Sequence, residues 1–212
     1  MISPSKVHFF LLRGLEDLPD SISATISLSL GVKPFNSNWF DKKEHFKTKL
    51  LRLNNDVDAA LKEDKIIYFI GVSAGASLAM AYFLHYPKKV SFIYSVCGLL
   101  NPNLHRLKLT RFIKMSHSFH QTARYLTSHL TPKNIEKYNL ADKVSAYSST
   151  KDDLVPLKAS EPSWVTIKKR IKVQHRRPRL NRLFRWLHLT NHVSTITDIL
   201  LEDIKKQRKL FE

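Results

Sequence analysis

The feature that most constrains the fold is an alternation of short apolar runs with segments of helical periodicity. The runs "VHFFLL", "KIIYFIG" and "VSFIYSVCGLL" are each typical of a strand buried on both faces. Between the first two, residues 41–64 carry apolar residues at helical spacing, with Lys, Glu and Asn on the other face. Between the second and third, an Ala-, Leu- and Met-rich segment ends at Pro87. This alternation predicts βαβ units and an α/β fold with a mostly parallel sheet.

The rest of the chain adds weaker elements. A short extended piece is expected at 32–35, a strand at 143–149, and a final helix with an apolar stripe near the C-terminus. Residues 101–140 contain helix-like pieces and no strand run, which favours a helical insertion over the carboxyl edge of the sheet. Late in the chain, "IKKRIKVQH" at 167–175 and "RLFRWLHL" at 182–189 are alternative candidates for a further strand, and the first is favoured.

Length and cysteine content limit the organisation. A chain of 212 residues holds one well-filled core, so we expect a single domain over 1–212 with the insertion at about 101–140. The single cysteine, Cys97, excludes an intrachain disulfide framework, and we interpret it as a small buried apolar side chain rather than a reactive thiol. The apolar run near the N-terminus is too short for a signal peptide or a membrane span, so a cytoplasmic location is expected.

The charge is strongly basic. Thirty-five Lys and Arg against eighteen Asp and Glu give a formal net charge of +17, which favours contact with anionic surfaces. Nine basic residues and no acidic one lie within 167–186. Residues 176–190 interleave arginines with apolar and aromatic side chains, so they are a candidate contact with an anionic membrane, or only a solvated basic face. Nucleic acid is a weaker candidate because charge alone supports it. The sequence does not indicate the oligomeric state.

Two of the five glycines flank one serine in "GVSAG", between a predicted strand and a predicted helix. In a strand-to-helix turn this tight, the residue at the bend takes an unusual backbone conformation, and the residues two positions before and after it must be small. Gly71 and Gly75 meet that requirement. The side chain of Ser73 then projects above the carboxyl ends of the strands, beside a helix N-terminus that favours negative charge.

Strand, Gly-x-Ser-x-Gly and helix together resemble the nucleophile elbow of the α/β-hydrolases. The resemblance extends from the first strand to the final helix and implies a three-layer α/β/α sandwich with Ser73 as nucleophile. The alternative is a glycine-permitted turn whose serine only caps the helix.

The family's chain order is nucleophile, acid and histidine. The turn "TKDDLVP" after the predicted strand at 143–149 resembles the family's acid turn and selects Asp152, with Asp153 as second choice. His192, directly ahead of the final helix, resembles the family's histidine, although Asn191 replaces the usual glycine. His188 is a weaker candidate.

The resemblance also implies two backbone donors for an oxyanion. One is the N–H of Ala74, the residue after the nucleophile. The other is the N–H of Leu15, because Arg13-Gly14 resembles the family's His-Gly pair, with Arg in place of His.

These residues predict a serine esterase or related acyl hydrolase that acts on a small-molecule ester, with no cofactor and no metal. His117 and His120 lie three residues apart, but no carboxylate or cysteine near them in the sequence completes a metal-ligand set. Two alternatives stay open: a basic protein that binds anionic lipid or nucleic acid on an inactive fold of this kind, and a thioesterase or acyltransferase with the same triad.

Overall fold

The computed structural model describes residues 6–15, 32–41, 43–101, 116–150, 152, 155–171 and 202–203. Its centre is a sheet whose strands are β1 (Val7–Leu12), β2 (Val32–Phe35), β3 (Ile66–Val72), β4 (Phe92–Val96), β5 (Val144–Ser148) and β6 (Ile167–Arg170). The spatial order is β2-β1-β3-β4-β5-β6, and all of these neighbours pair in parallel. The predicted α/β class is therefore confirmed, and β6 confirms the first of the two segments proposed for the late strand.

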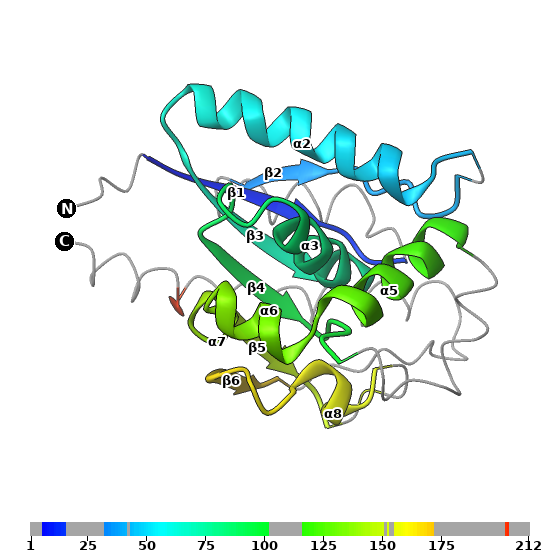
Figure 1. The fold of residues 1–212 in the computed structure, drawn as a ribbon, viewed down its shortest axis with the longest axis vertical. Helices are drawn as coiled ribbons and strands as arrows, with labels where there is room; N and C mark the ends of the chain where they lie inside the picture. The colour runs from blue at the N-terminus through cyan, green and yellow to red at the C-terminus, as the bar shows by residue number, and fades with distance from the viewer. Residues whose placement is uncertain are drawn as a thin grey trace, which may run out of the picture.

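Three long helices cover one face of the sheet: α2 (Phe46–Lys62), α3 (Ala74–His85) and α5 (His117–His129) (Figure 1). Every residue of α3 from Ala74 to Leu84 is buried, because the helix packs against β3 and β4 and also against α5. A helix that is enclosed in this way must be apolar all round, which explains its Ala-, Leu- and Met-rich composition.

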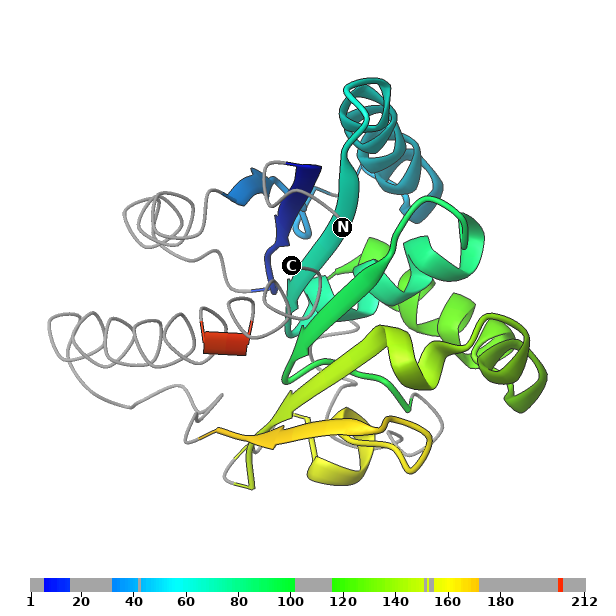
Figure 2. The ribbon, with the colours of Figure 1, turned by 90° about the vertical axis from the view of Figure 1, so that its left-hand side faces the viewer.

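The sheet buries apolar side chains on both faces. Phe10 and Leu12 of β1 join the core beneath the helices, whereas Phe9 and Leu11 join a second apolar cluster on the opposite face. Figure 2 shows α2, α3 and α5 on one side of the sheet and the short helical piece 202–203 on the other. Burial on both faces is why these strands appear in the sequence as continuous apolar runs.

Asp203 connects the short helical piece 202–203 to this sheet. Asp203 is buried and accepts hydrogen bonds from the Tyr147 hydroxyl in β5 and from the Lys169 ammonium in β6. The C-terminal helical piece is thus fixed to the two strands that follow β4 in the sheet.

The segment between β4 and β5 contains α5, α6 (Pro132–Lys137) and α7 (Leu140–Lys143), and α8 (Leu157–Ser160) follows β5. Of the helix-like pieces expected here, at about 107–130 and 134–139, the first contains α5 and the second overlaps α6, while residues 107–115 lie outside the described ranges. The side chain of Ser116 caps α5 by accepting from the Phe119 N–H, and α5 packs against both α3 and α2. That the insertion forms a cap stays a prediction, since residues 102–115 lie outside the described ranges.

One expectation about α2 is wrong. The helical pattern assigned its lysines to the exposed face, but Lys49 is fully buried, in an ion pair with Glu44. The helix also begins at Phe46 rather than near Asp41, because the Asp41 carboxylate accepts from the Lys43 N–H ahead of the helix. Within the described residues, no helix is both long enough and apolar enough to cross a membrane.

Candidate active site

Ser73 is the single residue between the end of β3 and the start of α3, and its backbone is left-handed, with φ 54° and ψ −119°. The unusual conformation expected at this bend is confirmed. The Ser73 N–H donates to the Val96 carbonyl at 2.8 Å, and the Ser73 carbonyl accepts from the Ala76 N–H at 3.0 Å. A non-glycine residue in such a conformation costs about 1–3 kcal/mol and persists only where its surroundings impose it.

The flanking glycines make this turn sterically feasible. A Cβ added at Gly71 would lie 2.4 Å from the Ala76 Cα, and one added at Gly75 would lie 2.0 Å from the Leu12 carbonyl oxygen. Both contacts are with backbone atoms, which cannot rotate away. The requirement for small residues on both sides of Ser73 is therefore confirmed.

The turn lies where the strand order of the sheet changes direction. The chain passes from β1 outward to β2 and then returns to β3 on the other side of β1, so the carboxyl ends of β1 and β3 border a topological switch point. Ligands of open α/β sheets bind in the crevice outside such a point. Ser73 follows β3 there, and the loop of residues 13–15 follows β1.

This loop lies directly against Ser73. A Cβ added at Gly14 would lie 3.0 Å from the Ser73 Cβ and 3.6 Å from its Oγ. Leu15 is buried, as is Ala74 at the start of α3. The N–H of Ala74 belongs to the first turn of the helix, whose N–H groups have no partner within the helix. Ala74 thus directly follows the serine, and Leu15 directly follows the glycine that lies against it, while their role as oxyanion donors stays a prediction.

Asp152 follows β5 and is buried, with 9% of its surface exposed. Its Oδ1 accepts from the Val155 N–H at 2.9 Å. The carboxylate is also hydrogen-bonded to the thiol of Cys97, the residue that follows β4. Burial, and then the charge of Asp152, raise the pKa of the Cys97 thiol well above its ordinary value. The interpretation of Cys97 as a buried, unreactive side chain agrees with this environment.

Ser73 and Asp152 follow strands that are separated by β4 alone. Two strand spacings amount to about 10 Å, which leaves room for one imidazole ring between a hydroxyl and a carboxylate. His192, His188 and Asp153 lie outside the described residues, so the histidine of the predicted triad stays a prediction.

The other expected features are only partly described. The exposed Lys168 and Arg170 on β6 belong to the basic segment, but residues 172–190, including the proposed membrane contact at 176–190, lie outside the described ranges. His117 is exposed, and its Nε2 lies 3.0 Å from the Gln121 Nε2. Among the described residues, no group of three or more His, Cys, Asp or Glu side chains could hold a metal ion.

Sequence reasoning missed one contact of the candidate site. The indole N–H of Trp39 donates to the Arg13 carbonyl at 2.9 Å, so a tryptophan on another loop holds the segment that borders Ser73. The sequence feature that could have indicated this contact is a tryptophan in the polar stretch "NSNWFDKKEHF". If such a tryptophan is buried, its indole N–H requires a hydrogen-bond acceptor.

Solved structures with the same arrangement of elements are numerous. An α/β hydrolase enzyme from the metagenome of Mar Chica lagoon sediments in Morocco is 16% identical, with a TM-score of 0.62 and coverage of 95% of this chain and 92% of that one. The chain has the α/β-hydrolase fold. Est1E from Butyrivibrio proteoclasticus, in a structure with ferulic acid bound, is 14% identical, with a TM-score of 0.59 and coverage of 96% and 92%.

A third structure with this fold is a lipase-esterase related protein from Clostridium acetobutylicum. It is 13% identical, with a TM-score of 0.56 and coverage of 93% of this chain and 94% of that one. No protein-family model matches the sequence, and no curated protein matches it significantly. The resemblance first carried by the residues around Ser73 is therefore confirmed at the level of the fold.

Proposed function

We propose that the protein is a serine hydrolase that cleaves a carboxylic ester or a related acyl bond. The observation that carries the proposal is the left-handed backbone of Ser73 at the carboxyl end of β3, against the loop of residues 13–15. Strain of this kind is kept at functional sites, whereas a serine that only capped a helix would not need it. Ser73 also forms no side-chain cap hydrogen bond in α3, which disfavours the capping role.

In this mechanism the Ser73 hydroxyl attacks the carbonyl carbon of the ester while His192 removes its proton. The oxygen of the tetrahedral intermediate carries the negative charge, and the N–H groups of Leu15 and Ala74 stabilise it. His192 then protonates the leaving alcohol, and an acyl group remains on Ser73. His192 then removes a proton from water, whose oxygen attacks the acyl carbon, and returns that proton to the Ser73 oxygen as the bond to the acyl group breaks and the acid is released.

Asp152 orients His192 and stabilises its charged form. The Val155 N–H and the Cys97 thiol both donate to the Asp152 carboxylate, so the carboxylate is held at a fixed position beyond β4. A carboxylate that orients a histidine must itself be held in place by other hydrogen-bond donors. These contacts support Asp152 as the acid.

Labelling with a fluorophosphonate probe tests the proposal. The native protein should label, and the Ser73→Ala and His192→Ala variants should not, because the probe reacts only with a serine that a base has activated. Ser77→Ala is the matched control, since Ser77 is a buried serine one turn further along α3. It should label like the unmodified protein. A folded protein that does not label would contradict the proposal, and binding to anionic vesicles and nucleic acid would then be measured.

A further inference from the structure

The loop of residues 13–15 is held from outside by a second loop between β2 and α2, of which residues 36–41 and 43–45 are described. The Trp39 indole N–H donates to the Arg13 carbonyl at 2.9 Å, and the Ser37 hydroxyl lies 3.4 Å from the same oxygen. Both side chains are 2% exposed. Since a peptide unit is planar, holding the Arg13 carbonyl also fixes the direction of the Gly14 N–H and the point where the next peptide starts.

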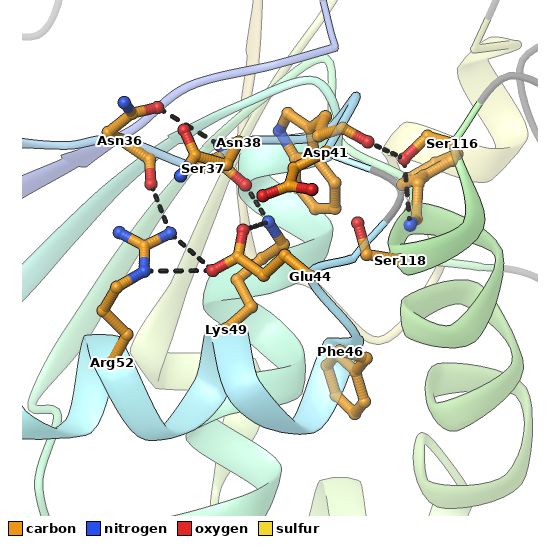
Figure 3. A network of polar contacts seen from close by, with 12 residues as sticks. Asn36, Ser37, Asn38, Asp41, Glu44, Phe46, Lys49, Arg52, Ser116 and Ser118 are labelled. Atoms are coloured by element: carbon orange, nitrogen blue, oxygen red, sulfur yellow. Dashed lines mark hydrogen bonds and ion pairs between the residues drawn. The ribbon is translucent and has the colours of Figure 1, made fainter.

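Trp39 is itself held by a buried cation. The Lys49 ammonium lies 4.9 Å from the centroid of the Trp39 ring, and Lys49 has no exposed surface. The ammonium pairs with the Glu44 carboxylate at 2.7 Å and donates to the Ser37 carbonyl. Figure 3 shows Lys49 and Arg52 extending from α2 toward the backbone of residues 36–38, with Glu44 between them.

Side chains from α2 and from the start of α5 make further contacts with the loop that contains Trp39. Arg52 donates to the Glu44 carboxylate at 2.8 and 3.0 Å and to the Asn36 carbonyl at 2.7 Å. From α5, the Ser116 hydroxyl donates to the Trp39 carbonyl at 2.6 Å, and the Phe119 ring stands perpendicular to the Trp39 ring. Removing one partner of a buried charge pair strongly destabilises a protein, so loop conformations that separate Lys49 from Glu44 are disfavoured.

We propose that Trp39 is a positioning residue for oxyanion stabilisation, acting through the Arg13 carbonyl to hold the Leu15 N–H at the correct place beside Ser73. The inference rests on the proposed function. Donors to a developing oxyanion must be held within about 0.5 Å of the productive geometry. The Trp39 N–H holds the Arg13 carbonyl from outside the loop, and this contact limits how far the following peptides can move. The buried Lys49–Glu44 pair sets the position of the tether.

Trp39→Phe tests this directly, because it removes the N–H donor but keeps an aromatic ring against Lys49 and Phe119. Losing one oxyanion donor lowers kcat by about 100- to 1,000-fold, and here the donor is loosened rather than lost, so we expect a fall of about 10- to 100-fold. KM should change by less than about twofold, because an oxyanion contact is made only in the transition state. Ser37→Ala, which removes the longer contact with the same carbonyl, should lower kcat less, by about two- to fivefold.

Tyr82→Phe is the matched control. Tyr82 is fully buried, and its hydroxyl donates to the Asn54 Oδ1 at 3.0 Å, between α3 and α2. That oxygen also accepts from the Lys89 ammonium at 2.8 Å, so the substitution leaves no buried acceptor without a partner. The control therefore removes one buried donor from an aromatic side chain without touching residues 13–15.

The experiment measures hydrolysis of p-nitrophenyl acetate per active site, with active sites counted from fluorophosphonate labelling at completion. A merely structural role for Trp39 would lower the melting temperature and the number of labelled sites but not kcat per labelled site. We expect kcat per site to fall in Trp39→Phe and Ser37→Ala and to stay unchanged in Tyr82→Phe. Amide hydrogen exchange at residues 14 and 15 should accelerate in Trp39→Phe, less in Ser37→Ala, and not in Tyr82→Phe.

The outcomes separate the two proposals. If the unmodified protein neither labels nor hydrolyses the ester, the proposed function fails, and the positioning role of Trp39 fails with it. If the unmodified protein is active and Trp39→Phe retains its kcat per site within about twofold, the positioning role is overturned while the proposed function stands. An equal fall in Tyr82→Phe would also overturn it.

Discussion

Replacing Gly75 by alanine gives the sharpest test of how the turn at Ser73 is built. Gly75 is the second residue of α3, and in an ordinary helix an alanine is more stable than a glycine by about 1 kcal/mol. Helix propensity alone therefore predicts that Gly75→Ala stabilises the protein.

The structure predicts the opposite sign. The added Cβ would lie 2.0 Å from the Leu12 oxygen, 2.5 Å from the Leu12 carbonyl carbon and 2.6 Å from the Arg13 oxygen. Ordinary contact begins at 3.4 Å, so the start of α3 and the end of β1 must separate by 1.4 Å. Neither backbone can move without disturbing the core on both faces of the sheet. Overpacking in a core costs about 1–3 kcal/mol, and a clash between two backbones should cost at least about 4 kcal/mol.

Urea denaturation followed by circular dichroism measures the free energy of unfolding. A loss of about 4 kcal/mol would be a large part of the stability of a typical domain, so the Gly75→Ala protein should unfold at a much lower urea concentration than the unmodified protein. Gly14→Ala is the control, because the closest contacts of its Cβ are 3.0 and 3.1 Å and require a shift of only a few tenths of an ångström. It should cost about 1 kcal/mol. A Gly75→Ala protein as stable as the unmodified one would refute the reasoning.

Three further results are expected. Ser73→Gly should raise the free energy of unfolding by about 1 kcal/mol, because glycine adopts φ 54° without strain. The same substitution should abolish fluorophosphonate labelling, and a destabilised variant would contradict the expected gain in stability. Cys97 should resist alkylation by iodoacetamide at about pH 8 in the folded protein and react once the protein is unfolded, because burial and the nearby Asp152 charge keep the pKa of its thiol high. Rapid alkylation of the native protein would contradict this expectation. Burial, and then the charge of Asp58, raise the pKa of Tyr82 above its ordinary value of 10.0. Below pH 10 the Tyr82 phenol is therefore protonated in both the folded and the unfolded state. Above pH 10 it ionises only in the unfolded state. The free energy of unfolding should therefore fall with rising pH above about 10, more steeply in the unmodified protein than in Tyr82→Phe, and parallel slopes would contradict this assignment.

Much of the sheet could be predicted because burial on both faces leaves a simple signal. The run "VHFFLL" coincides with β1, and "KIIYFIG" overlaps β3 with a shift of one residue. β6 was harder to predict because it is an edge strand with the sequence IKKR, mostly exposed, so two segments competed for its place. A strand with little apolar surface is specified by its neighbour in the sheet more than by its own composition.

The geometry at Ser73 could be predicted for a different reason. A Cβ at Gly71 would clash with Ala76, five residues later, so that part of the steric rule is local in sequence. A Cβ at Gly75 would clash with Leu12 and Arg13 at the end of β1, and this contact follows from the packing of the helix against the sheet. The tether of the neighbouring loop could not be predicted in the same way. It joins Trp39 to a carbonyl in another loop, and carbonyl groups are present at every residue, so the sequence contains nothing that identifies the acceptor.

Lys49 shows the limit of pattern reasoning most clearly. Its position falls between Phe46 and Leu53 on the buried stripe of α2, where a helical pattern expects an apolar residue. Lysine is almost never fully buried without a partner, so its place depended on Glu44, five residues earlier in a turn that the pattern had assigned to the helix. Burial lowers the pKa of Lys49, and the Glu44 carboxylate opposes that shift. Only the folded chain brings that partner into place.

The central claim is that Ser73 becomes covalently acylated, and trapping that intermediate tests it most directly. The protein is mixed with p-nitrophenyl acetate, quenched in acid during turnover and digested, and the peptides are analysed by mass spectrometry. We expect one acetyl group on the peptide that contains Ser73, and no acetyl group on the corresponding peptide of the Ser73→Ala protein. Turnover of the ester with no acetyl group on Ser73, or with an acetyl group on another residue that persists in Ser73→Ala, would contradict it.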